Sequence, residues 1–228
     1  MLQYISHQIG QPRKLVVFLH GYNGSIADHQ YAVDWLLNKV ENAVVVTPQA
    51  PEICDKNPEK FQWFGMVKYD PDRRRSLAET SVADILAIYN APRELIDDRA
   101  AEINLFIDTL QSKFNIGDAQ TFLIGFSQGA MLTIYTALTR AHEIGGAFAL
   151  SGLVAGTELL QHRIQSRPLL YMYHGKDDMK VQYKTLPSGL QWLKEHQINV
   201  TARTYDGLDH RMIEDELTDV AAHINAAV

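Results

Sequence analysis

The chain has 228 residues, of which 46% are hydrophobic and 21% are charged, with a formal net charge of −6. This length suits one domain with a sizeable core, and we expect a single domain over residues 1–228. The negative charge argues against a general nucleic-acid binder, and the apolar runs are too short to form an integral membrane segment.

Apolar runs alternate with segments of helical periodicity along the chain. Continuous apolar runs predict strands that are buried on both faces, and apolar positions spaced by three or four predict helices packed on a sheet. The alternation therefore predicts an α/β fold, with a mostly parallel central sheet and helices on both faces. In chain order, we expect an edge strand at Leu2–Ile9, a strand at Lys14–His20, a helix at Ala27–Val40, a strand at Ala43–Thr47, helices at Ser81–Tyr89 and Pro92–Phe114, a strand at Thr121–Ile124, a helix from Gln128 to Leu138, strands at Gly146–Leu150 and Pro168–His174, a helix around Gly189–His196, a strand at Asn199–Tyr205 and a helix at Met212–Ala227.

The connection from Glu52 to Arg75 is long and has no clear periodicity. Irregular loops of this length in compact domains are often lids or binding loops. The run Arg73-Arg74-Arg75 favours a solvated loop face. Trp63 and Phe64 fit a place in the core and a place in a substrate groove equally well.

Gly125-Phe126-Ser127-Gln128-Gly129 fits the G-x-S-x-G nucleophile elbow. A short apolar strand precedes it and a largely apolar helix follows, which is the context that this motif requires. The tight turn exposes the serine oxygen, and glycine on either side avoids a collision of Cβ atoms. The helix points free N–H groups and its positive dipole end toward Ser127, where they stabilise a developing negative charge.

A serine hydroxyl needs a base to take its proton, and histidine titrates in the right range. In folds with this elbow the order along the chain is serine, acid, histidine. His210 follows the final predicted strand and should reach the edge that carries Ser127, whereas His196 and His223 fall in helices. The acid is expected just past the strand that ends at His174, where the residues alone do not separate Asp177 from Asp178.

Two backbone N–H groups are needed to hold the oxyanion. The residue after the nucleophile, Gln128, supplies one of them. The second comes from the loop after an early strand, and the loop that begins His20-Gly21-Tyr22 has the right position and contains small residues. We therefore expect the amides of Tyr22 and Gln128 to form the oxyanion hole.

These motifs together resemble the phospholipase/carboxylesterase family of α/β-hydrolases, which includes acyl-protein thioesterases. The resemblance covers the chain from about Leu15 to its end. It rests on five blocks that stand in the family's order: Leu19-His20-Gly21, Pro48-Gln49-Ala50-Pro51, Gly125-Phe126-Ser127-Gln128-Gly129-Ala130, His174-Gly175-Lys176-Asp177-Asp178-Met179-Lys180-Val181 and Gly207-Leu208-Asp209-His210.

The resemblance implies an α/β-hydrolase fold and hydrolysis of carboxylic esters or thioesters through an acyl-enzyme, without a metal or cofactor. The family's acid motif, His-Gly-x-x-Asp-x-x-Val, selects Asp178 over Asp177. Two departures bear on substrate preference. Tyr22-Asn23-Gly24 stands where the family usually has Leu-Gly-Asp, and Gln49 stands where it usually has histidine.

The resulting prediction is a serine carboxylesterase or thioesterase that uses Ser127, His210 and Asp178. Its substrate is expected to be a small-molecule ester or thioester, an acylated protein or a lysophospholipid. In the lysophospholipase alternative, Trp63, Phe64 and Met66 form an acyl groove. A further alternative, from another class, is a binding protein that kept the fold and lost useful turnover.

Cysteine usage and the N-terminus bear on location. Cys54 is the single cysteine, so no intrachain disulfide can form, which fits a reducing compartment. Met1–Gly10 lacks the basic and apolar regions of a secretory signal. We therefore expect a cytoplasmic protein, as a monomer or a homodimer.

Overall fold

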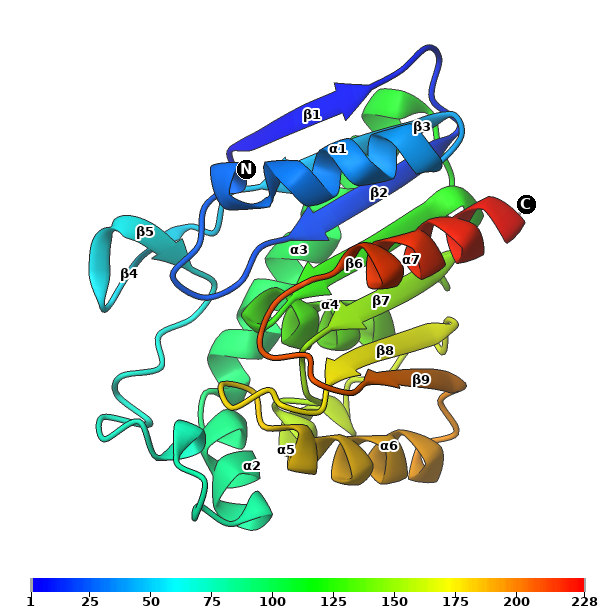
Figure 1. Cartoon of the computed structure of the whole chain (residues 1–228). Coiled ribbons are helices and arrows are strands. Elements are labelled where there is room, and N and C mark those ends of the chain that lie inside the picture. Colours follow the sequence, from blue (N-terminus) through cyan, green and yellow to red (C-terminus); the bar gives the residue numbers. More distant parts are fainter. Residues whose placement is uncertain (1, 228) are drawn as a thin grey trace.

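A seven-stranded sheet runs through the middle of the molecule (Figure 1). Its strand order is β1-β3-β2-β6-β7-β8-β9, and only the pairing of the edge strand β1 with β3 is antiparallel. The computed structural model describes residues 2–227. The strands of this sheet are β1 (Tyr4–Gln8), β2 (Lys14–Leu19), β3 (Ala43–Pro48), β6 (Thr121–Phe126), β7 (Gly146–Leu150), β8 (Leu170–Gly175) and β9 (Val200–Tyr205).

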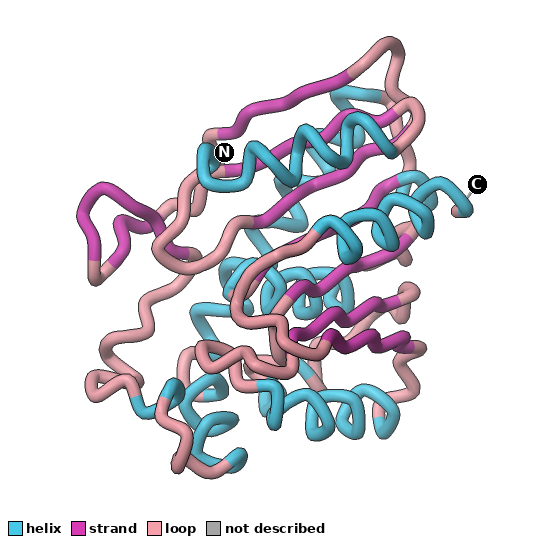
Figure 2. Tube along the Cα trace, viewed as in Figure 1, coloured by secondary structure: helices cyan, strands magenta, loops and turns pink. Residues whose placement is uncertain are grey.

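Helices cover both faces of the sheet, so the predicted α/β architecture is confirmed. One face packs against α1 and α7, and the opposite face packs against α2, α3, α4 and α6. Figure 2 shows that loops gather at the carboxyl ends of the parallel strands. The helices are α1 (Gln30–Lys39), α2 (Val82–Asn90), α3 (Arg93–Phe114), α4 (Gln128–Thr139), α5 (Thr157–Leu160), α6 (Leu186–Glu195) and α7 (Glu214–Ala226), with short 3₁₀ turns η1 (Ile26–His29), η2 (Arg74–Ser76), η3 (Asp118–Gln120) and η4 (Tyr183–Thr185).

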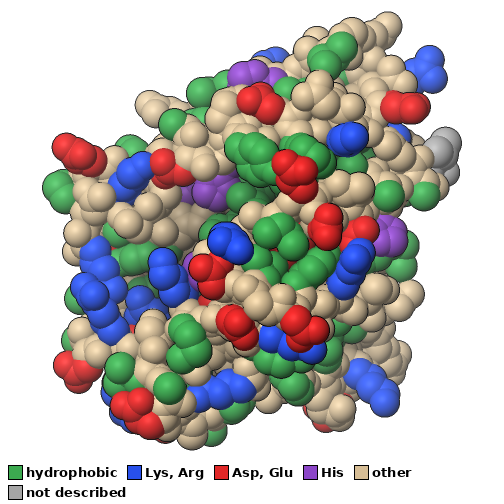
Figure 3. Space-filling model, in the orientation of Figure 1, with side chains coloured by type: hydrophobic (Ala, Val, Ile, Leu, Met, Phe, Trp, Pro, Cys, Tyr) green, Lys and Arg blue, Asp and Glu red, His purple; other side chains and the backbone are tan. Residues whose placement is uncertain are grey.

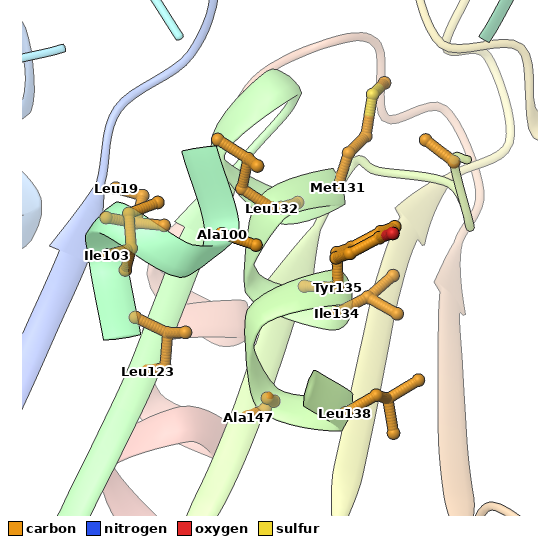
Figure 4. Packing of buried hydrophobic residues seen from close by; sticks show 14 of the residues in the cluster. Leu19, Ala100, Ile103, Leu123, Met131, Leu132, Ile134, Tyr135, Leu138 and Ala147 are labelled. Carbon is orange, nitrogen blue, oxygen red and sulfur yellow. The ribbon is translucent and has the colours of Figure 1, made fainter. Parts of the chain in front are cut away.

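Helix α4 is buried from Gln128 to Leu138, because it lies between the sheet and α3. Figure 4 shows Leu132 and Ile134 on opposite sides of α4, with Ala100 and Ile103 of α3 on the side of Leu132. Burial of apolar side chains on this scale holds an element firmly in place. The N-terminus of α4, where Ser127 lies, is therefore fixed relative to the strand before it.

The prediction of an irregular segment from Glu52 to Arg75 is wrong in its first half. Residues Glu52–Cys54 (β4) and Asn57–Gln62 (β5) form an antiparallel hairpin, which projects from the carboxyl-end edge of the sheet (Figure 1). Backbone hydrogen bonds between Gly24 and Phe61 tie this hairpin to the loop after β2. These short strands carry no apolar alternation, so the sequence pattern does not predict them.

Candidate active site

Ser127 stands between β6 and α4 in a strained backbone conformation, with φ 55° and ψ −116°. This conformation is rare for a residue with a side chain and persists only where the surroundings enforce it. The glycines on either side allow this conformation, because without a Cβ they let the neighbouring backbone segments approach closely. A Cβ on Gly125 would lie 2.3 Å from the carbonyl oxygen of Gly129, and one on Gly129 would lie 2.2 Å from that of Leu19. The turn is therefore pressed against the end of β2.

A continuous hydrogen-bonded chain links Ser127, His210 and Asp178. The Nε2 atom of His210 lies 2.9 Å from the Ser127 Oγ, and its Nδ1 atom lies 2.7 Å from Asp178 Oδ2. These residues follow β6, β9 and β8, so the topology of the sheet brings three distant loops together at one edge. Because a carboxylate only accepts, Nδ1 donates to Asp178 and Nε2 is free to accept the serine proton.

The neighbouring aspartates Asp177 and Asp178 differ in burial and in hydrogen bonding. Asp178 is buried, and its Oδ1 accepts the backbone N–H groups of Lys180 and Val181, both at 2.9 Å. Asp177 is exposed, and it has no hydrogen bond with His210 among the described residues. Only Asp178 is held so that one oxygen faces the imidazole.

The other histidines considered from the sequence lie elsewhere. His196 follows α6 and stacks on Trp192, and His223 of α7 lies against Tyr171. His174 is buried beside Asp178, where its Nε2 donates to the carbonyl of Val181 at 2.7 Å. Burial lowers the pKa of His174. His174 is therefore neutral, and its hydrogen bond to Val181 supports the loop that carries Asp178.

The loop after β2 is shaped by His20. Its Nδ1 donates to the carbonyl of Gly21 at 2.8 Å, and its Nε2 accepts the N–H of Ala50 at 3.0 Å. Burial lowers the pKa of this imidazole to about 4, so it stays neutral and keeps this tautomer. Within residues 2–227, the amides of Tyr22 and Gln128 donate to no other protein group, which leaves both available to a bound oxyanion.

Trp63 and Phe64 are fully buried and line no part of the cavity beside Ser127, whereas Met66 does line it. The Gln128 side chain accepts the Trp63 N–H at 2.9 Å and donates to the Phe64 carbonyl at 2.7 Å. The Trp63 indole donates to the carbonyl of His20 at 2.7 Å. The expectation of substrate contacts at Trp63 and Phe64 is therefore corrected. Both are core residues whose backbone is hydrogen-bonded to the side chain of Gln128, the residue after the nucleophile. No local sequence pattern indicates these contacts, since the partners are far apart in the chain.

A cavity of about 520 Å³ opens beside Ser127. Figure 3 shows a hollow on this face, with Lys and Arg side chains gathered along one side. Apolar side chains line part of it, namely Met66, Tyr89, Phe126, Met131 and Val181. Lys56, Arg73, Arg75 and Lys180 line it as well, and sequence reasoning assigned none of these four to the site.

Over residues 2–227, no cluster of three or more His, Cys, Asp or Glu side chains is arranged as a metal site. Within the same residues, no helix combines the length and the apolar character that crossing a bilayer requires.

The sequence matches a known protein family over almost its whole length. The phospholipase/carboxylesterase family model matches residues 2–228. The chain belongs to the phospholipase/carboxylesterase family. This membership confirms the resemblance seen in the motifs and the predicted class of ester or thioester hydrolase.

Individual relatives match across almost their whole length. Acyl-protein thioesterase 1 of Saccharomyces cerevisiae is 25% identical over 98% of this chain and 97% of its own. Acyl-protein thioesterase 1 of Candida albicans is 30% identical over 93% of this chain and 91% of its own. The crystal structure of esterase PE8 is 27% identical, covers 100% of this chain and 99% of its own, and superposes with a TM-score of 0.79. The predicted α/β-hydrolase fold is confirmed.

Proposed function

We propose that this chain hydrolyses carboxylic esters or thioesters through an acyl-enzyme formed on Ser127. The observation that carries the proposal is the hydrogen-bonded chain from Ser127 Oγ through His210 to Asp178. Such a chain converts a weak hydroxyl nucleophile into a reactive one. Its position at the carboxyl edge of the sheet, open to the cavity, gives a substrate access to the serine.

The geometry supports a two-stage reaction. His210 Nε2 takes the Ser127 proton while Oγ attacks the acyl carbonyl, and the Tyr22 and Gln128 amides hold the resulting oxyanion. The imidazolium then gives its proton to the departing alcohol or thiol. Asp178 keeps the ring oriented and stabilises its charged form. In the second stage His210 activates a water molecule, which releases the acid and regenerates Ser127.

The substrate class follows from the relatives and from the cavity. Two relatives are named acyl-protein thioesterases, which supports an acylated protein as well as a small ester as the substrate of this chain. Met66 remains a candidate contact for the acyl group, because it lines the cavity. We also propose that the chain works in the cytoplasm as a single domain, either as a monomer or as a homodimer.

A chain-length series of p-nitrophenyl esters, from acetate to palmitate, tests the proposal on the wild type and on Ser127→Ala. The variant should lose most of the rate enhancement and keep about 10³–10⁴ over water from the oxyanion hole and binding. An acyl-thioester and a lysophospholipid in the same assay separate the thioesterase and lysophospholipase alternatives. Near-full esterase activity of pure Ser127→Ala protein would refute the mechanism.

A further inference from the structure

The charges around the cavity do not match those of the molecule as a whole. Acidic residues outnumber basic ones in the sequence, 27 against 21. Among the described residues that line the cavity, however, there is no Asp or Glu, while four cations are present. We call this group the cationic rim: Lys56, Arg73, Arg75 and Lys180.

The cationic rim is assembled from three separate segments of the chain. Lys56 lies in the turn of the β4–β5 hairpin, Arg73 and Arg75 lie at η2, and Lys180 follows Asp178. Side chains of the Lys180 segment hold η2 in place. Gln182 donates to the carbonyls of Arg75 and Leu77, at 2.8 and 2.9 Å. The arginines are therefore fixed relative to the loop that carries Asp178.

The nearest carboxylates are occupied by other donors. Asp70 is buried, accepts the N–H of Arg74 at 2.6 Å and forms an ion pair with Arg75. Asp55 accepts the Tyr22 hydroxyl and the N–H groups of Met66 and Val67. Within residues 2–227, Lys56, Arg73 and Lys180 form no ion pair. Three charges of one sign thus line the cavity without an ion-pair partner among residues 2–227.

Two details indicate that this arrangement is enforced. Arg73 adopts a left-handed backbone conformation, with φ 56°, which is uncommon for a residue with a side chain. The pKa of Lys56 is lowered, first by burial and then by the charges of Arg75 and Arg73, against the opposing charges of Asp55 and Asp70. Like charges held this close disfavour one another unless an anion binds between them.

On the basis of the proposed function, we propose that the cationic rim selects esters or thioesters that carry an anionic carboxylate or phosphate group in the same molecule. The apolar side chains beside Ser127 contact the acyl group, and Lys56, Arg73 and Lys180 pair with the anion. Charge complementarity at a cleft raises both encounter rate and specificity. The proposal makes these three cations specificity-determining residues and gives them no part in bond cleavage.

Matched ester pairs test this. On the acyl side, mono-p-nitrophenyl glutarate is compared with p-nitrophenyl valerate, which has the same chain length. On the alcohol side, 4-acetoxybenzoate and 4-acetoxyphenyl phosphate are compared with methyl 4-acetoxybenzoate. The variants are Lys56→Gln, Arg73→Gln, Lys180→Gln and their combination, and Lys194→Gln on the exposed side of α6 is the matched control.

Each single substitution should lower kcat/KM for an anionic ester by about three- to tenfold and leave the neutral partner within about twofold. The pair that responds identifies carboxylate or phosphate, and the acyl or the alcohol side. Raising the ionic strength should reduce the preference of the wild type, because salt screens exposed charges. Lys194→Gln should change neither rate.

Binding gives a second readout that does not depend on turnover. Calorimetry on the Ser127→Ala protein compares monomethyl glutarate with dimethyl glutarate, and the monoanion should bind about tenfold more tightly. The combined variant should lose that difference. Equal affinities for the two glutarate esters would overturn the proposed role of the cationic rim. An equal loss of kcat/KM on neutral and anionic esters in the variants would overturn it as well. Loss of the proposed function looks different, since neutral esters would then fail as well.

Discussion

At the scale of single residues, the contacts of Asp178 distinguish it from its neighbour Asp177. Its two oxygens have separate tasks, since Oδ1 is held by the amides of Lys180 and Val181 and Oδ2 faces His210. An acid fixed in this way keeps the imidazole in the tautomer whose Nε2 can accept a proton. Among residues 2–227, the exposed side chain of its neighbour Asp177 has no comparable contacts.

Replacing Asp178 by Asn should lower kcat by about 10³–10⁴, because the amide favours the wrong imidazole tautomer. Asp177→Asn is the matched control and should keep kcat within about twofold. Ester hydrolysis by the two purified variants, with circular dichroism to verify folding, measures this difference. Equal effects of the two substitutions would remove Asp178 from its proposed role.

At the scale of single elements, the elbow depends on how closely β6, α4 and the end of β2 approach one another. Gly129 has no room for a Cβ, since the nearest carbonyl oxygens belong to Leu19 and His20, at 2.2 and 2.7 Å. Strands β2 and β6 pair in parallel up to Gly125. The position of Ser127 therefore depends on backbone packing as much as on side-chain contacts.

Gly129→Ala should destabilise the protein by about 3 kcal/mol or more, because the backbone of α4 and the loop after β2 must separate. Gly117→Ala is the control, since its nearest neighbour would lie 3.5 Å from the new Cβ, and it should change stability by less than about 0.5 kcal/mol. Denaturant unfolding measures both. A native-like free energy of unfolding for Gly129→Ala would contradict the described packing.

The start of α7 contains a buried carboxyl group. Glu216 accepts the N–H of Ile213 at 3.0 Å through Oε2, while Oε1 has no partner among the described residues. Burial raises the pKa of Glu216 from 4.5 to about 7. The folded state therefore binds this proton more tightly than the unfolded state, so stability falls as the pH rises from 4.5 through 7.

Glu216→Gln removes that titration and keeps an acceptor for Ile213. Its stability relative to the wild type should rise by about 2 kcal/mol between pH 5 and pH 8. Thermal unfolding at both values measures the change, and Glu195→Gln on the exposed side of α6 should show no such trend. A constant difference between wild type and Glu216→Gln would mean that Glu216 does not titrate in this range.

At the scale of the whole molecule, two apolar cores lie on the two faces of the same central sheet. Unfolding of one core would disrupt strands that also form the other core. We expect a single cooperative unfolding transition for the full chain, as for one domain. Calorimetry measures it, with equal calorimetric and van't Hoff enthalpies as the expected result. Two resolved transitions would argue for separate folding units.

The sequence predicts the parts of this molecule that depend on local patterns. The apolar runs at Lys14–His20 and Ala43–Thr47 predict strands β2 and β3, and the strand–turn–helix context predicts a strained turn at Ser127. No local pattern predicts the β4–β5 hairpin, because its short strands pair with each other and with Gly24 and carry no periodic signal.

Contacts between distant residues account for the rest. Spacing alone leaves Asp177 and Asp178 equivalent. The resemblance to the family's acid motif selects Asp178, and the path of the loop after β8 turns this residue toward His210. The backbone N–H of Trp63 donates to the side chain of Gln128, which lies 65 residues away in the chain. The cationic rim likewise joins three segments that no local pattern connects.

The central claim is that Ser127 carries the acyl group during turnover. Intact-protein and peptide mass spectrometry after reaction with a fluorophosphonate, and after rapid quenching with a p-nitrophenyl ester, tests it most directly. We predict one adduct per chain, on the peptide that contains Ser127, and none in Ser127→Ala. An adduct on another residue, or turnover without any covalent adduct, would contradict the account.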